Sequence, residues 1–276
     1  MVVVDPLIPS RLEMPFQADL MTLYPLPDFH LGMYSWKEET GEDFDLYIAR
    51  DLLRDTMGTL MGMGPDSETG IILNLGDYFH SDSNENRTRR SGAALDVDTR
   101  YAKVLDFGSK LMVDVVGMAL QKHPRVILRN IPGNHDPYAT IALTAIMQAF
   151  FRNEPRVTVD PDPGPFWWYK HGKVLLGATH GDMAKPEKMP AIMAAKQSEA
   201  WGQTKFRYNY IGHFHTVRAG GEDGGAYWEV LDTIAPKDAW NNQMGFLSGR
   251  RLQSISHDAE KGEVVRLTVP VIGGPK

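Results

Sequence analysis

Five short apolar runs in the sequence each lead into a sharp turn that carries Asp, His or Asn side chains. The turns are Asp28-Phe29-His30, Gly76-Asp77, Gly133-Asn134-His135-Asp136, His180-Gly181-Asp182 and Gly212-His213-Phe214-His215. Longer segments with helical periodicity lie between several of these runs. Alternating strands and helices are typical of α/β folds, where side chains that follow the carboxyl ends of strands gather in one cleft. The pattern therefore predicts an α/β protein whose polar turns form a single site.

The apolar periodicity predicts the individual elements. Strands are expected at 19–25, 70–75, 125–131, 157–159, 166–169, 174–178, 207–211, 227–231, 251–255 and 264–271, and helices at 44–61, 101–121, 138–152 and 189–201. The polar stretch 81–96, rich in Asn, Arg, Ser and Gly, is expected to be a long exposed loop. No segment has the composition of a linker, which favours a single domain over residues 1–276.

Composition excludes several classes of protein. The chain has no cysteine, so it contains no disulfide framework, thiolate metal site or cysteine nucleophile. No run approaches the roughly twenty apolar residues of a membrane span, and the N-terminus lacks the basic region of a secretory signal. We therefore expect a cytoplasmic protein without a membrane partner. The net charge of -6 argues against nonspecific polyanion binding, although cations bound at a carboxylate-rich site would offset part of it.

The polar residues of the five turns form a coherent set of metal ligands. Six of the nine histidines lie in or beside these turns. Imidazole, carboxylate and amide groups without sulfur suit Mn²⁺, Fe, Zn²⁺ or Ni²⁺ better than Ca²⁺ or soft metals. Seven ligands are too many for one tetrahedral ion, but they fit two ions about 3.5–4 Å apart with a shared carboxylate. The candidate ligands are Asp28, His30, Asp77, Asn134, His180, His213 and His215. The competing interpretation, polar turn and cap residues without a metal, must explain five coincidences at once.

Taken in order, the five motifs resemble those of the calcineurin-like metallophosphoesterase superfamily across residues 28–215. Asp28-Phe29-His30-Leu31-Gly32 and Gly76-Asp77-Tyr78-Phe79-His80 are most similar to the motifs of Mre11/SbcD-type DNA nucleases. The resemblance implies a four-layer sandwich, in which two packed mixed β-sheets are flanked by helices. It also implies two divalent ions, with Mn²⁺ as the first expectation.

The resemblance further implies how the seven ligands are shared. Asp77 would bridge both ions. The remaining ligands would divide into one set of Asp28, His30 and His215 and a second set of Asn134, His180 and His213.

Four further residues receive expected roles. By resemblance, His135 would stabilise the scissile phosphate or protonate the leaving oxygen, and Asp136 would orient His135. His80 would face the substrate, although packing or hydrogen bonding beside Asp77 explains its presence equally well. Arg87, with Arg89 and Arg90 on the same loop, could bind substrate phosphates. A solvated loop explains these three arginines equally well, since neighbouring acidic residues dilute their charge.

The implied reaction is phosphodiester hydrolysis by a hydroxide that bridges the two metals. DNA is the first expected substrate because of the two nuclease-like motifs. A small-molecule phosphodiesterase or phosphatase is the alternative, favoured by the acidic net charge. A scaffold of the same fold without catalysis ranks last, since none of the seven expected ligands is missing. The sequence does not indicate an oligomeric state.

Overall fold

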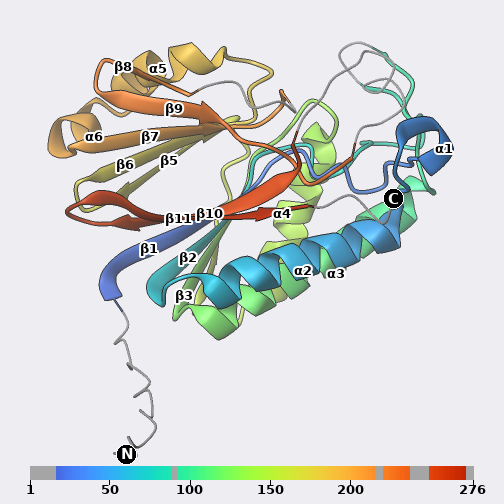
Figure 1. Ribbon diagram of the computed structural model, residues 1–276, viewed down its shortest axis with the longest axis horizontal. Helices are drawn as coiled ribbons and strands as arrows, with labels where there is room; N and C mark the ends of the chain where they lie inside the picture. The colour runs from blue at the N-terminus through green and yellow to red at the C-terminus, as the bar shows by residue number, and fades with distance from the viewer. Residues whose placement is uncertain (1–16, 89–91, 215–219, 237–248, 272–276) are drawn as a thin grey trace, which may run out of the picture.

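The computed structural model describes residues 17–88, 92–214, 220–236 and 249–271 (Figure 1). Six strands form the first sheet in the order β11-β10-β1-β2-β3-β4. Strands β1 to β4 run parallel, whereas β10 is antiparallel to β1 and β11 to β10. Their bounds are β1 Gln17–Leu26, β2 Ser67–Asn74, β3 Arg125–Asn130, β4 Val157–Val159, β10 Arg251–Asp258 and β11 Gly262–Pro270.

Five strands form the second sheet in the order β5-β6-β7-β9-β8. Its three central strands, β6, β7 and β9, are parallel, and the two edge strands are antiparallel to their neighbours. Their bounds are β5 Phe166–His171, β6 Val174–Thr179, β7 Phe206–Ile211, β8 Gly221–Asp223 and β9 Ala226–Val230. Both sheets are therefore mixed, as the sequence predicted.

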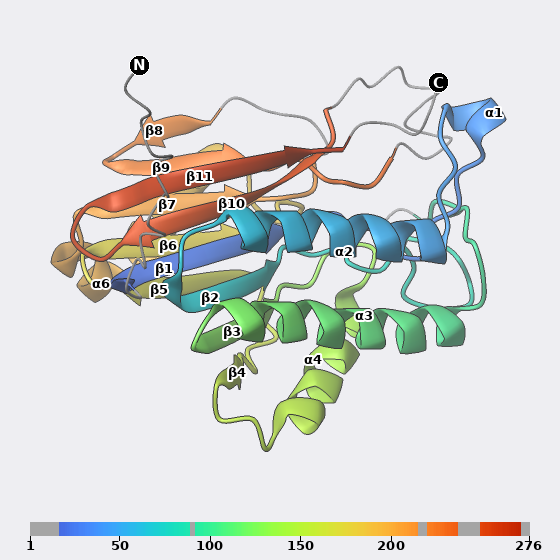
Figure 2. The ribbon, with the colours of Figure 1, turned by 60° about the horizontal axis from the view of Figure 1, so that its bottom comes forward.

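Helices cover the outer face of each sheet, which completes four layers (Figures 1 and 2). Helices α2, α3 and α4 lie against the first sheet, and α5 packs against β9 of the second. The helices are α1 Lys37–Thr40, α2 Leu46–Met63, α3 Tyr101–Lys122, α4 Pro137–Phe151, α5 Met189–Lys196 and α6 Ser198–Gln203, with a 3₁₀ turn η1 at Pro186–Lys188. The α/β prediction of two packed sheets flanked by helices is confirmed.

The central strands are buried on both faces, which explains their continuous apolar runs. In β2, Ile71 and Leu73 face the core between the sheets, whereas Ile72 faces the core beneath α2 and α3. In β5, Trp167 packs into the core between the sheets and Trp168 packs on the opposite face, near α5. Successive side chains of a strand alternate in this way, and both layers of core depend on that alternation.

Some local expectations differ from the structure. The helix expected at 189–201 is two helices, because the backbone at Gln197 leaves the helical region with φ -125° and ψ 41°. The polar stretch 81–96 is not simply an exposed loop. Ser81 and Asp82 are buried, and the Asp82 carboxylate accepts hydrogen bonds from the N–H groups of Tyr138 and Ala139 at the start of α4. In the described part of the chain, no helix combines the length and apolar character needed to cross a membrane.

Candidate metal centre

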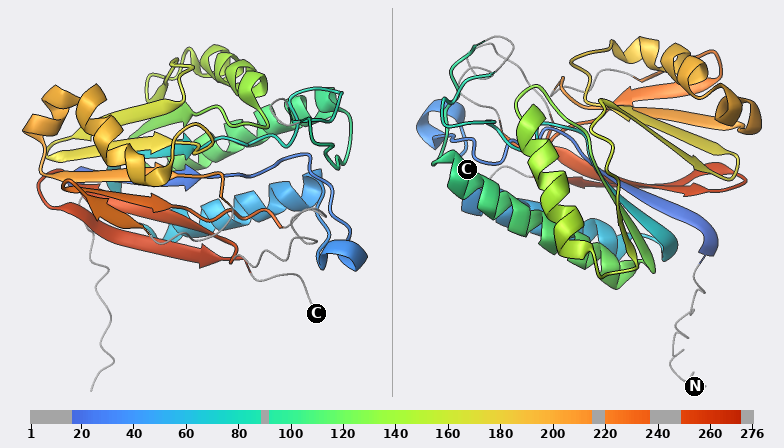
Figure 3. Two further views of the ribbon diagram at one scale, coloured as in Figure 1. Left: turned by 90° about the horizontal axis from the view of Figure 1, so that it is seen from above. Right: turned by 180° about the vertical axis from the view of Figure 1, so that it is seen from behind.

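The first two polar turns lie side by side because the pairing of β1 with β2 continues beyond the ends of both strands. The N–H of Asp28 donates to the carbonyl of Gly76 at 3.1 Å, and the N–H of His30 donates to the carbonyl of Asp77 at 2.9 Å. The loops that follow β1, β2 and β3 gather at one end of the sheets (Figure 3). The carboxyl ends of parallel strands meet at that edge, as the sequence predicted.

Two groups of potential ligand atoms meet at this edge. The nitrogen and oxygen atoms that Asp28, His30 and Asp77 offer lie within 4.8 Å of one another, and so do those of Asp77, His180 and His213. Asp77 belongs to both groups, which is the arrangement that a bridging carboxylate requires. Five of the seven expected ligands are thus brought together by side chains from four different turns.

Asn134, the sixth expected ligand, joins the second group through His180. His180 Nε2 lies 3.1 Å from Asn134 Oδ1 and 3.1 Å from Asp77 Oδ2. His180 Nδ1 lies 2.9 Å from the carbonyl oxygen of Leu75, which can only accept, so Nδ1 carries a hydrogen. When Nε2 carries no hydrogen, as a metal-bound ring requires, it presents a lone pair to two oxygens that are also electron-rich. A cation between these three atoms satisfies all of them, so the donor set fits a metal ion.

The pKa shifts show that positive charge is stabilised between Asp77 and His180. Burial alone would raise the pKa of Asp77, but the positive charge of His180 and neighbouring imidazoles outweighs burial and holds it well below its ordinary value. Burial alone would lower the pKa of His180, but the Asp77 carboxylate raises it to about 10. Burial and the charge of His180 lower the pKa of His213. Asp77 is therefore ionised at neutral pH, as a metal-bridging carboxylate must be.

Four of the expected ligands have backbone conformations in the left-handed region. The φ angles are 48° at Asp28, 52° at His30, 52° at Asp77 and 72° at His213. Residues other than glycine rarely adopt this region, at a cost of roughly 1–3 kcal/mol each when the surroundings impose it. Such backbone strain is concentrated at functional sites. Here it occurs at residues whose side chains converge on the centre.

Two of the glycines beside the ligands are required for close approach. A Cβ on Gly133 would lie 2.0 Å from Asp77 Oδ1 and 2.3 Å from the Asp77 backbone nitrogen. A Cβ on Gly212 would lie 2.8 Å from Asp28 Oδ2. These glycines allow the turns to pack directly against the two carboxylates.

His135 lies beside the ligands in an orientation suited to proton transfer. Its backbone N–H donates to Asp77 Oδ1 at 2.8 Å, and its Nδ1 lies 2.9 Å from the carbonyl oxygen of His80. Because a carbonyl oxygen only accepts, Nδ1 carries a hydrogen and Nε2 is the atom left to exchange a proton. This geometry is compatible with the expected role of His135.

The role expected for Asp136 needs correction. Its carboxylate does not hold the His135 ring but accepts backbone hydrogen bonds from Asp77 at 3.1 Å, Gly133 at 3.0 Å and Phe79 at 3.0 Å. The physical reason is burial: Asp136 is fully enclosed at the start of α4, where those three N–H groups point toward it. Burial and the nearby Asp77 carboxylate raise the pKa of Asp136 to about 6. Asp136 therefore joins the second and third turns to each other.

The structure describes two of the residues expected to contact substrate, His80 and Arg87. His80 is only 1% exposed, and its ring contacts His30 and His135 rather than solvent. Arg87 is exposed, but its guanidinium donates to the carbonyl of Gly92 at 2.8 Å and so supports its own loop. His215, the seventh expected ligand, lies outside the described residues, as do Arg89 and Arg90.

Thr233 is a contributor that the sequence did not reveal. Its hydroxyl donates to the backbone carbonyl of Asp28 at 2.6 Å and accepts from the N–H of Ala235 at 2.9 Å. Thr233 follows β9, so the end of a sixth strand, after β1, β2, β3, β6 and β7, supports the centre. The signal was present, because a polar Asp232-Thr233 pair follows an apolar strand, as in the five turns.

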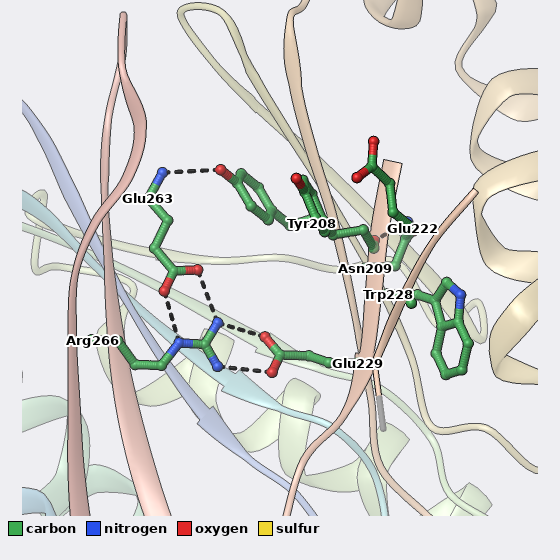
Figure 4. Close-up of a pocket in the computed structure, with 10 residues that line it drawn as sticks. Tyr208, Asn209, Glu222, Trp228, Glu229, Glu263 and Arg266 are labelled. Carbon is green, nitrogen blue, oxygen red and sulfur yellow. Dashed lines mark hydrogen bonds and ion pairs between the residues drawn. The ribbon is translucent and has the colours of Figure 1, made fainter. Parts of the chain in front are cut away.

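A separate cavity of about 550 Å³ lies between β7, β8 and β9 of the second sheet and β11 of the first (Figure 4). Tyr208 and Arg266 are among its lining residues. Arg266 donates to Glu229 at 2.6 and 2.8 Å and to Glu263 at 2.8 Å, so a continuous ion-pair network forms one wall. None of the six predicted metal ligands within the described residues lines this cavity.

No family model matches the sequence, and no curated protein matches it. Among solved structures, a conserved uncharacterised protein of Streptococcus pneumoniae, described as a predicted phosphoesterase, is 11% identical with a TM-score of 0.39, covering 91% of this chain and 98% of that one. Vps29 of Chaetomium thermophilum is also 11% identical with a TM-score of 0.39, covering 93% and 98%.

Proposed function

We propose that this protein is a phosphoesterase that uses two divalent metal ions. The observation that carries the proposal is the position of Asp77. Its carboxylate belongs to both groups of ligand atoms, and within each group the atoms lie within 4.8 Å of one another. A carboxylate shared between two clusters of imidazole and carboxylate groups is the arrangement of two-metal hydrolytic sites.

The residues divide into holding and reacting groups. Asp28 and His30, together with His215 as the resemblance implies, would hold one ion. Asn134, His180 and His213 would hold the other, and Asp77 would be shared by both. When bound, the two ions would supply hydroxide near neutral pH and neutralise the charge that develops on the phosphoryl oxygens. We propose Mn²⁺ as the first candidate for both ions, because it accepts mixed nitrogen and oxygen ligands.

His135 is the proton-transfer group of the proposal. Its Nδ1 is held by the carbonyl of His80 at 2.9 Å, which leaves Nε2 for the leaving oxygen. A general acid in this position typically accelerates hydrolysis by about 10²–10⁴-fold. Asp136 supports this group indirectly, by holding the backbone of Asp77 and Gly133.

For the substrate we propose a phosphodiester, with DNA as the first class, because the first two motifs resemble those of Mre11/SbcD-type nucleases. A small-molecule phosphodiester or phosphomonoester is the second candidate. Two observations favour it: the net charge of -6, and the engagement of Arg87 with its own loop rather than with the centre. A strongly basic surface would have favoured DNA.

A substrate panel tests the proposal. The metal-free protein is loaded with Mn²⁺ and incubated with single-stranded DNA, double-stranded DNA, a chromogenic phosphodiester and a chromogenic phosphomonoester. Asp77→Asn serves as the inactive variant, and His171→Gln as a control for loss of a histidine outside the centre. Cleavage of DNA by wild type and His171→Gln, but not by Asp77→Asn, supports the nuclease. Cleavage confined to the small esters supports the second candidate, and no metal-dependent cleavage of any of the four rejects the phosphoesterase.

A further inference from the structure

His80 occupies an unusual position, because its ring and its backbone contact two different histidines of the centre. Its Nδ1 lies 3.3 Å from His30 Nδ1, and its carbonyl oxygen lies 2.9 Å from His135 Nδ1. The His80 ring also stacks on the His135 ring, with 5.4 Å between centroids and 26° between planes. One residue thus contacts both an expected metal ligand and the expected proton-transfer group.

The backbone fixes this position. The N–H of Leu31 donates to the carbonyl of Tyr78 at 2.8 Å, and the N–H of His80 donates to the carbonyl of Leu31 at 3.0 Å. His80 and His30 therefore lie on two segments that pair like strands. With exposures of 1% for His80 and 3% for His30, their rings meet in a buried environment where an unsatisfied polar contact is costly.

The chemistry of the Nδ1 pair restricts the tautomers. Two imidazole nitrogens at hydrogen-bond distance need one hydrogen between them, so one ring donates and the other accepts. His30 Nδ1 faces His80, which leaves His30 Nε2 as the atom that can bind a metal. A metal-binding nitrogen carries no hydrogen, so the hydrogen of neutral His30 resides on Nδ1 and is donated to His80.

We propose that His80 is a positioning residue: its Nδ1 accepts the hydrogen of His30 Nδ1 and thereby presents His30 Nε2 to a metal ion, while its carbonyl and ring orient His135. This inference rests on the proposed two-metal function. Outer contacts of this kind typically change metal affinity by about 10- to 100-fold when they are removed. His80 itself contacts neither metal nor substrate in this assignment, which replaces the substrate contact expected from the sequence.

Two variants of His80 separate its role as hydrogen-bond acceptor from the stacking of its ring. His80→Phe keeps a ring that can stack on His135 but removes the acceptor. His80→Asn places an amide oxygen near the former Nδ1 position and can restore the hydrogen bond to His30. His171→Phe is the control, since His171 contacts the carbonyl of Asp19 outside the centre.

The first readout is Mn²⁺ binding to the metal-free full-length protein by calorimetry, which does not depend on activity. We expect His80→Phe to weaken one of the two binding events by about 10- to 100-fold, and His80→Asn and His171→Phe to stay within about threefold of wild type. Equal binding of both ions by His80→Phe and wild type would overturn the proposal. The proposal would also be overturned if His80→Phe bound only one ion and His80→Asn did not restore binding of the second, because His80 would then be a ligand. The nitrogens of His30, His80 and His135 lie within 4.8 Å of one another, which makes that outcome chemically accessible.

The second readout is the tautomer of His30 in the wild-type protein, measured from its ring ¹⁵N shifts by NMR. It requires no variant to fold. We expect hydrogen on Nδ1, and hydrogen on Nε2 would overturn the assignment. If wild type cleaves no phosphoester while both readouts follow the expectation, the proposed function fails and the positioning role stands. If wild type cleaves a phosphoester but neither readout gives the expected result, the positioning role fails while the proposed function stands.

Discussion

The Asp28 carboxylate accepts a hydrogen bond of 2.7 Å from the backbone N–H of His213, which lies 185 positions further along the chain. Asp28 follows β1 of the first sheet, and His213 follows β7 of the second. The carbonyl of Asp28 also accepts from Thr233, which follows β9 of the second sheet. The centre is therefore built across the line where the two sheets meet, and the packing of the sheets sets the spacing of its ligands.

Adding one methyl group at Gly133 should disrupt the centre. In Gly133→Ala the new Cβ would lie 2.3 Å from the backbone nitrogen of Asp77, which cannot move without displacing the second turn. We expect a loss of stability of about 1–3 kcal/mol and at least about tenfold weaker Mn²⁺ binding. Denaturant unfolding and calorimetry measure the two effects.

The matched control is Gly58→Ala in α2, where an added Cβ meets nothing within 4 Å. Alanine favours a helix over glycine by roughly 0.5–1 kcal/mol, so this variant should be slightly stabilised with normal metal binding. If Gly133→Ala behaved like Gly58→Ala, the close packing of Gly133 on Asp77 would be irrelevant to the centre.

Removing Asp77 and removing His135 should have different consequences. Asp77→Ala removes the carboxylate shared by both ligand groups and should abolish metal retention at both positions. His135→Ala should retain both ions but lower kcat by about 10²–10⁴-fold, because it removes a proton-transfer group and no ligand. Metal analysis after gel filtration and steady-state kinetics provide the comparison. Unchanged turnover in His135→Ala would remove this residue from the reaction.

Metal removal should lower thermal stability. Ions that bind only the folded protein stabilise it by about 2.7 kcal/mol per site at a concentration 100-fold above Kd. For a chain of this size, one such site corresponds to a rise in Tm of roughly 5–10 °C. Differential scanning calorimetry of chelated and Mn²⁺-loaded protein measures the difference. Asp77→Ala should show no rise, and an equal rise in this variant would place the ions elsewhere.

Much of the fold followed from local sequence patterns, for physical reasons. Strands such as β2 are buried on both faces, so their apolar runs were visible, and the polar residues that end them share one edge. The short elements β8 and α1 were missed, since neither contains an apolar side chain, whereas the equally short β4 has two valines. The break at Gln197 was missed as well, because no Gly or Pro marks it.

The ligand set was more predictable than the contacts that support it. Asp28, His30, Asp77, His180 and His213 converge because each follows a strand end. The partners of Asp136 and His80 depend on how neighbouring turns pack, and the sequence records no such contact. The left-handed backbone of Asp77 was not predicted either, since glycine is the residue from which that conformation is usually inferred.

The last prediction concerns His257, which is buried in β10 with Nε2 2.9 Å from the hydroxyl of Tyr210. Burial lowers the pKa of His257 to about 3 in the folded protein. Its ordinary value is about 6.5, so between these values the unfolded chain binds more protons and stability falls as the pH falls. At pH 5 the free energy of unfolding should be lower than at pH 8 by roughly 2 kcal/mol.

His257→Gln keeps an amide near Nε2 but cannot titrate, so its unfolding free energy should depend less on pH by that amount. Urea unfolding of chelated wild type and variant at both pH values isolates the effect, because contributions common to both proteins cancel. Identical pH dependence would mean that His257 can take up a proton in the folded protein as easily as in the unfolded chain.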